Sequence, residues 1–154
     1  MLTYGHTEPV QVYFDDLDAM GLLHNSRYTV LMERAMAGFW GPRGWSHDPA
    51  RSKLKDVLLV VREVKVTYHV PITGTSAPLV HIWIDRIGRS SIVYGFRITS
   101  ADRSVTHAEG HRVNVNLDPV TLRPAEISDE TRAIAAELVR PTEPADLAEL
   151  AQAG

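Results

Sequence analysis

The stretch VYFDDLDAMGLLHNSRY, residues 12–28, decides how the rest of the chain is organised. It places three carboxylates, a glycine, a histidine and an asparagine between a short strand, expected over Pro9 to Phe14, and a long amphipathic helix. A simple connection between two elements does not need so many polar groups. We therefore expect the chemistry of this protein to lie in this connection.

The helix that follows is indicated by the spacing of its apolar residues. They recur at i, i+3, i+4, i+7, i+8 and i+11 and form one face: Tyr28, Leu31, Met32, Ala35, Met36 and Phe39. We expect a helix from about Asn25 to Trp40, with Asn25 or Ser26 as its N-cap and with a left-handed Gly41 and Pro42 ending it. The carboxylates then come just before a helix N-terminus, where unpaired N–H groups and the helix dipole favour negative charge.

Composition limits the classes of protein that remain. The 154 residues suit one domain, expected over residues 1–140, followed by a tail rich in Pro, Ala and Glu over 141–154. A formal net charge of −3 gives no electrostatic case for binding nucleic acid. Cysteine is absent, which removes disulfides and cysteine-based catalysis or zinc binding. The N-terminus has no secretory-signal pattern and no apolar run is long enough to span a membrane, so we expect a cytoplasmic protein without membrane contact.

After residue 57 the apolar period changes from that of a helix to two. Strands are expected from Val57 to about Val70, then over Leu79–Ile87, Ile92–Thr99 and Val105–Leu117, and a helix from Ser128 to about Val139. One strand, a long buried helix and a run of antiparallel strands predict an α+β fold, with the sheet wrapped around the central helix. Pairing of exposed strand edges predicts a homodimer.

Two sets of residues resemble the hotdog-fold acyl-CoA thioesterases, and most closely the 4-hydroxybenzoyl-CoA thioesterase branch. The first is Phe14-x-Asp16-x-Asp18-x-x-Gly21, followed by Asn25, Tyr28 and Glu33-x-Ala35; the second is a Pro71…Gly74 turn and, later, Gly88-Arg89-Ser90-Ser91. The resemblance covers roughly Val10 to Leu117. It departs from the family at Leu22, where many relatives have histidine, and at His24, where an asparagine or an aromatic residue is common.

The resemblance implies a thioester hydrolase that releases a free acid from an acyl-CoA or acyl-carrier-protein substrate. Asp18 matches the catalytic carboxylate and would act as a nucleophile, through a mixed anhydride, or as a general base on water. The backbone N–H of Asn25 would stabilise the oxyanion. His24 would contact the thioester carbonyl or the leaving group, or only line the pocket. The resemblance also implies a homodimer that assembles into a tetramer. The sequence has no P-loop, no dinucleotide glycine fingerprint and no metal-ligand cluster, so we expect neither a cofactor nor a metal.

The remaining polar residues have ordinary structural explanations beside the functional ones. Asp18 itself could be a turn residue, and Asp16 suits a structural role, in which it accepts hydrogen bonds from backbone N–H groups of the turn. Tyr28 lies on the apolar stripe but would also face substrate. We expect Glu33, off that stripe, to make an intersubunit or helix-surface contact.

A polar turn, expected between two strands, is the candidate site for the CoA part of the substrate. It consists of Gly88, Arg89, Ser90 and Ser91. The Arg89 guanidinium would pair with the CoA phosphates. The structural alternative is an ordinary hairpin with a surface arginine.

Two other functions remain open at this stage. A hotdog hydratase or dehydratase pairs a histidine with a carboxylate, which His24 and Asp18 could imitate. A non-catalytic acyl-CoA-binding module would lack the carboxylate, and Asp18 is present. A metal site at His107 and His111 is not expected, because residues four apart on a strand lie about 13 Å from each other.

Overall fold

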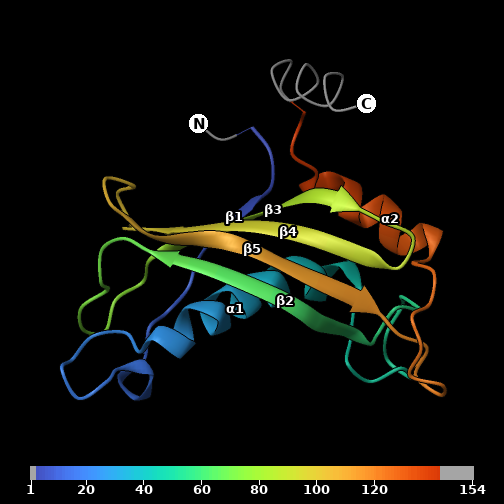
Figure 1. Cartoon of the computed structure of the whole chain (residues 1–154), viewed down its shortest axis with the longest axis horizontal. Helices are drawn as coiled ribbons and strands as arrows, with labels where there is room; N and C mark the ends of the chain where they lie inside the picture. Colours follow the sequence, from blue (N-terminus) through green and yellow to red (C-terminus); the bar gives the residue numbers. More distant parts are fainter. Residues whose placement is uncertain (1–2, 143–154) are drawn as a thin grey trace.

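Five antiparallel strands and one long helix make up most of the fold in the computed structural model, which describes residues 3–142 (Figure 1). The sheet has the order β1-β3-β4-β5-β2, and α1 lies against one of its faces. The bounds are β1 His6–Pro9, α1 Tyr28–Trp40, β2 Leu59–Tyr68, β3 Leu79–Ile87, β4 Ser91–Thr99, β5 Thr106–Asn116 and α2 Asp129–Ala135. The α+β class is confirmed, while the tail predicted over 141–154 lies, from residue 143 onward, outside the described residues.

Helix α1 buries the apolar stripe that the sequence predicted. Five of its six members are buried and the sixth, Met36, is half-buried against the same core. The helix begins three residues later than predicted, because Asn25–Arg27 form a separate 3-10 turn. The N-cap of that turn is His24, whose Nδ1 accepts a hydrogen bond from the Ser26 N–H at 3.2 Å, so the prediction of Asn25 or Ser26 as cap is wrong.

The C-terminal end of α1 also differs in detail from the prediction. Gly41 keeps a right-handed conformation, with φ at −56°, and opens a 3-10 turn over Gly41–Arg43. The left-handed residue is Gly44, at φ +100°. The helix therefore ends where Gly41 and Pro42 were expected to end it, but the reversal of the chain comes three residues later.

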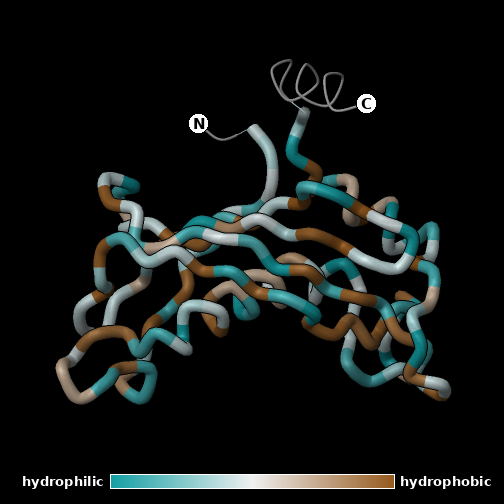
Figure 2. Tube along the Cα trace, viewed as in Figure 1, coloured by the Kyte–Doolittle hydropathy of each residue, from teal (hydrophilic) through white to brown (hydrophobic). Residues whose placement is uncertain are grey.

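The later strands agree with the prediction within one or two residues, and β3 agrees at both ends. Hydrophobic and hydrophilic residues alternate along the strands, which gives the sheet an apolar face toward α1 (Figure 2). The prediction of the first strand is wrong, because β1 is His6–Pro9 rather than Pro9 to Phe14. Its partner β3 begins only at Leu79, so the chain beyond Pro9 runs beside a loop, where Val10 and Val12 donate to the carbonyls of Pro78 and Ser76.

Strand β2 lies at the edge of the sheet and is mostly exposed within one chain. Its apolar residues Val61 and Tyr68 are 47% and 50% exposed, and Val64 is exposed as well. A bulge between Val61 and Glu63 shifts the register against β5. The period of two along this strand would suit one buried face, but a single chain does not bury it, which leaves an apolar edge open for pairing.

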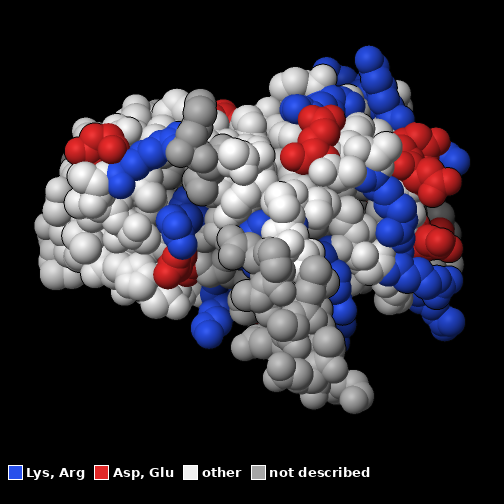
Figure 3. All heavy atoms as spheres, turned by 90° about the horizontal axis from the view of Figure 1, so that it is seen from above, with Lys and Arg blue, Asp and Glu red and all other residues white. Residues whose placement is uncertain are grey.

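The opposite face of the sheet, seen from above in Figure 3, carries charged side chains of both signs scattered among uncharged ones. Arg97 lies beside Glu109 at 3.0 Å, and Arg140 lies beside Asp85 at 2.8 Å. Such exposed pairs contribute little to stability, but they keep this face polar. No helix among residues 3–142 is long and apolar enough to cross a membrane.

Candidate active site

The loop before α1 is held in place by backbone hydrogen bonds rather than left loose. Isolated bridges join Leu17 to Leu23 and Leu22 to Thr73. Within the loop the Asp18 N–H donates to the Leu22 carbonyl at 2.7 Å, and the Gly21 N–H donates to the Asp18 carbonyl at 3.0 Å. Gly21 takes a left-handed φ of +74°, which a residue without a side chain adopts readily. The loop thus carries Asp18 on a fixed backbone.

Asp18 is half-buried, and its two carboxylate oxygens have different environments. Oδ1 accepts hydrogen bonds from the backbone N–H groups of Met20 at 2.8 Å and Leu22 at 3.1 Å. No donor within residues 3–142 bonds Oδ2. The structural role of a turn residue is therefore filled by one oxygen, and the other remains able to act on a substrate.

A cleft of about 580 Å³ opens beside this carboxylate, which is within the usual range for a small-molecule site. The cleft brings together Asp18, His24, Asn25 and Tyr28 from the predicted site. Its full lining is Asp18, Ala19, Met20, Leu22, Leu23, His24, Asn25, Tyr28, Tyr68, His69 and Pro71. Tyr68, His69 and Pro71, from the end of β2 and beyond, were not predicted as site residues, because they lie about 50 residues from Asp18 along the chain.

Tyr68 fastens the end of β2 to the start of the helical region. Its hydroxyl donates to the Asn25 carbonyl at 3.0 Å, and its ring packs edge-on against Tyr28 with centroids 5.0 Å apart. The Tyr28 hydroxyl accepts from the Ile72 N–H at 3.3 Å, and burial raises the pKa of this phenol. These contacts fix the backbone around Asn25, whose own N–H has no acceptor within residues 3–142.

His24 is exposed at the rim of the cleft. Because its Nδ1 accepts from the Ser26 N–H, the neutral ring carries its proton on Nε2. The side chain therefore offers one N–H donor to anything bound in the cleft. No hydrogen bond joins His24 to Asp18 among the described residues.

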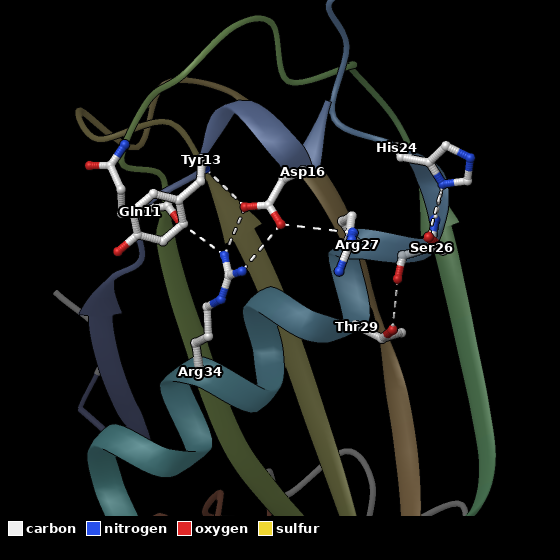
Figure 4. A network of polar contacts seen from close by, with 8 residues as sticks. All are labelled: Gln11, Tyr13, Asp16, His24, Ser26, Arg27, Thr29 and Arg34. Carbon is white, nitrogen blue, oxygen red and sulfur yellow. Dashed lines mark hydrogen bonds and ion pairs between the residues drawn. The ribbon is translucent and has the colours of Figure 1, made fainter. Parts of the chain in front are cut away.

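Asp16 has the structural role that the sequence predicted, in a network shown in Figure 4. Its side chain is 1% exposed and accepts from Arg34 through both oxygens, at 2.9 and 3.1 Å, and from the Tyr13 N–H at 2.9 Å (Figure 4). The Arg34 hydrogen bond is the main reason that the pKa of this carboxyl is lowered, and Arg27 adds a weaker contribution. This buried ion pair ties the loop to α1.

The polar turn Gly88–Ser91 lies at the other end of the sheet from Asp18. The Asn116 N–H donates to the Ser90 carbonyl, and the Arg132 guanidinium donates to the Gly88 carbonyl. The Arg89 side chain is 84% exposed and lies 3.9 Å from Glu126. One chain therefore does not bring these four residues to the cleft. Among residues 3–142 no group of three His, Asp or Glu side chains has the arrangement of a metal site.

Comparison with known proteins adds sequence and structural relatives. Residues 20–107 match the family model described as Thioesterase superfamily. Acyl-CoA thioester hydrolase YbgC of Escherichia coli O157:H7 is 27% identical over 116 residues, 75% of this chain and 84% of that protein. A Thermus thermophilus thioesterase, solved with coenzyme A and zinc, is 27% identical at a TM-score of 0.71, covering 88% of this chain and 96% of that one. A Pseudomonas aeruginosa protein shares the fold at a TM-score of 0.79 and 22% identity, over 91% and 95% of the two chains.

Proposed function

The chain belongs to the thioesterase superfamily and is a thioester hydrolase, and we propose that it converts an acyl-CoA to the free acid and CoA with Asp18 as catalytic carboxylate. The observation that carries this proposal is the half-buried Asp18 in a cleft beside a helical N-terminus, with one oxygen fixed by the loop. The relatives' names, and the coenzyme A bound to the Thermus thermophilus relative, support CoA as the carrier.

The proposed reaction uses groups that line the cleft. The Asn25 N–H and the Nε2–H of His24 would hydrogen-bond the thioester oxygen as it becomes an oxyanion. Asp18 Oδ2 would attack the carbonyl carbon, expelling the CoA thiolate and leaving an anhydride that water then opens. Alternatively, it would take a proton from the water that attacks. Both routes consume one water and give one acid and one thiol.

We further propose that the protein is a homodimer with α1 at the centre of each hotdog unit, assembling into a tetramer. The support is the exposed apolar edge of β2, which includes Val61, Val64 and Tyr68. Antiparallel pairing of β2 with its copy would cover this edge. It would also bring the Leu59 end of one chain beside the Tyr68 end of the other. Arg89 lies at the same end of the sheet as Leu59, so its guanidinium would become a candidate for contact with the CoA phosphates at the partner's cleft.

The hydratase alternative gains no specific support. It would need a histidine and a carboxylate acting together on one carbon. His24 uses Nδ1 to cap the turn at Asn25–Arg27 instead of bonding Asp18.

The test is hydrolysis of a panel of acyl-CoA and acyl-carrier-protein thioesters, followed with a thiol-detecting dye. Asp18→Asn should lower kcat by about 100- to 10,000-fold, the range for loss of a general base. Asp15→Asn is the matched control, because Asp15 is an exposed carboxylate in the same loop, and it should keep full activity. Hydrolysis of no member of the panel, or full activity in Asp18→Asn, would overturn the proposal.

A further inference from the structure

A second cavity, of about 260 Å³, lies under the C-terminal half of α1 at the other end of β2. Its lining is Glu33, Met36, Ala37, Trp40, Trp45, Leu59, Tyr94, Arg112 and Asn114. At about 30 Å³ for a water-sized group, the volume accommodates roughly eight such groups, which is the size of a short acyl chain. Most of the wall is apolar, so the polar groups in it need an explanation.

The most costly of these groups is a guanidinium buried in the wall. The Arg112 side chain is 7% exposed, whereas its ion-pair partner Glu33, at 2.7 Å, is 53% exposed. Nε of Arg112 donates to Asn114, which in turn donates to the Leu59 carbonyl. Within residues 3–142, no acceptor is bonded to Nη2 of this guanidinium, and this nitrogen is not one of the fully buried atoms that lack a partner, so it keeps some accessible surface. Burying a charge is unfavourable unless it is paired and fully hydrogen-bonded.

Two neutral donors in the wall also lack acceptors. The indole nitrogen of Trp45 is buried and has no hydrogen-bond partner among the described residues. The Tyr94 oxygen accepts from the Trp40 N–H at 3.2 Å, which leaves its own O–H to donate, and none of its neighbours in residues 3–142 is bonded to it as acceptor. An unpaired buried donor costs about 1–3 kcal/mol. The wall therefore carries donors on Arg112, Trp45 and Tyr94 that lack acceptors in the described part of the chain. Beside them lies the Glu33 carboxylate, which pairs with Arg112.

We propose that this cavity binds the far end of the acyl group and selects acyl groups carrying an acceptor oxygen there, as a ketone or a carboxylate. An acceptor oxygen would bond the Arg112 guanidinium in the wall, and a small shift of the wall would bring the buried donors of Trp45 and Tyr94 into reach, while the apolar wall packs against the carbon chain. A plain alkyl chain would leave those donors unpaired. This inference rests on the proposed function, because it assigns the acyl specificity of that same reaction.

The cavity reaches the Asp18 cleft through the proposed dimer rather than through one chain. Leu59 and Tyr68 are at opposite ends of β2, about 30 Å apart at the rise of a strand. That distance is too long for a short acyl group to span. Antiparallel pairing of two β2 strands brings the Leu59 end of one chain opposite the Tyr68 end of the other, so each cavity would serve the Asp18 of the partner.

The experiment compares three acyl-CoAs with six carbons in the acyl chain: hexanoyl-CoA, 5-oxohexanoyl-CoA and adipoyl-CoA. We expect the wild type to prefer one or both oxygenated substrates in kcat/KM, and the two arms separate ketone from carboxylate. Trp45→Phe keeps an aromatic ring and removes the N–H, and should reduce the preference by about 2- to 10-fold. Arg112→Met should reduce it by about 10- to 100-fold, as expected for a hydrogen bond to a charged group.

Trp83→Phe is the matched control, because Trp83 lies on the opposite face of the sheet and donates to Asp85 at 2.9 Å. It should leave the acyl preference unchanged. A second readout is equilibrium binding of the three acyl-CoAs to the Asp18→Asn variant, with and without Trp45→Phe, which does not require hydrolysis. Thermal unfolding of each variant identifies any that fails to fold. One folded cavity variant, Trp45→Phe or Arg112→Met, is sufficient to test the inference.

The outcomes separate the inference from the proposed function. Equal use and equal binding of all three substrates by the wild type, or a preference that survives in the folded cavity variants, would overturn the inference while thioesterase activity stands. If no acyl-CoA released its thiol but the oxygenated acyl-CoAs still bound more tightly than hexanoyl-CoA, the proposed function would be overturned and the inferred selectivity of the cavity would stand.

Discussion

The two ends of β2 differ in the polar groups that surround their cavities within the described residues: a carboxylate beside the free N–H of Asn25 at one end, and a paired guanidinium with a buried indole donor at the other. At the Tyr68 end, a loop presents the acceptor Oδ2 of Asp18 in a cleft of about 580 Å³. At the Leu59 end, a cavity of about 260 Å³ has donors on Trp45 and Arg112 without acceptors among residues 3–142. The first arrangement suits attack on a carbonyl carbon, and the second suits recognition of an oxygen. One chain thus carries a cleft with a catalytic candidate and a separate donor-bearing cavity, and the proposed dimer would bring the cavity of one copy to the cleft of the other.

The largest expected effect is a recovery of activity in a dimer of two different chains, one substituted at the Tyr68 end of β2 and the other at the Leu59 end. Asp18→Asn removes the carboxylate, and Ala37→Trp fills the mouth of the cavity from an exposed helix position. Each homodimer should be nearly inactive on six-carbon acyl-CoAs. A heterodimer, isolated through two different affinity tags, should recover about half of wild-type activity, because one of its two composite sites has no defect.

The control for this gain is a heterodimer that carries both substitutions in the same chain, paired with a wild-type chain. If sites are composite, both of its sites contain a defect and it should be inactive. If each site lay within one chain, the heterodimer with the two substitutions in separate chains would be inactive, and this control would keep about half of wild-type activity. That reversal would exclude the proposed connection between the two ends.

The next effect concerns Asp16 and Asp18, which are two residues apart and have different roles. Asp16→Asn leaves Arg34 without its carboxylate, and should lower the free energy of unfolding by about 2 to 4 kcal/mol. Asp18→Asn keeps an oxygen to accept from the loop N–H groups, so its unfolding free energy should change by less than about 1 kcal/mol. Urea unfolding of both variants measures the difference. Equal destabilisation would mean that Asp18 is also a structural residue.

The regular elements could be predicted from sequence because each repeats one pattern many times. The stripe of α1 and the bounds of β3 are examples, and both are confirmed. The first strand was misplaced because its length depends on where β3 begins, which local pattern does not contain. The His24 cap was missed because histidine seldom has that role.

The candidate site was predictable only where its residues are close in sequence. Asp18, His24, Asn25 and Tyr28 line one cleft because a single loop and helix carry them. Tyr68 comes from a distant strand, and the Arg34 partner of Asp16 lies off the apolar stripe, where an arginine usually faces solvent. The cavity at the other end involves Trp45, from a segment without any periodicity. The donors of this cavity could not be recognised from sequence, because only the fold shows that they are buried.

The smallest expected effect is a change in how stability depends on pH, and it involves a buried carboxylate at each end. Near the Leu59 end, burial opposes ionisation of Asp56, but hydrogen bonds from Thr131, Ser128 and Asn116 outweigh it and lower the pKa. The pKa of Asp16 is lowered mainly by Arg34. Both groups therefore contribute stability that is complete above their unfolded pKa of about 3.9 and is lost as the pH falls from there through the folded values.

Thermal unfolding between pH 7 and pH 3 measures this dependence. The Tm should fall below about pH 4, where the unfolded chain takes up protons before the folded one. Asp16→Asn removes one of the two groups, so its Tm should fall less steeply over that interval although it starts lower. Because Asp56 remains intact in this variant, some acid sensitivity should persist. An identical slope in the two proteins would show that Asp16 contributes nothing to the pH dependence of stability, and hence that its pKa is the same in the folded and the unfolded chain.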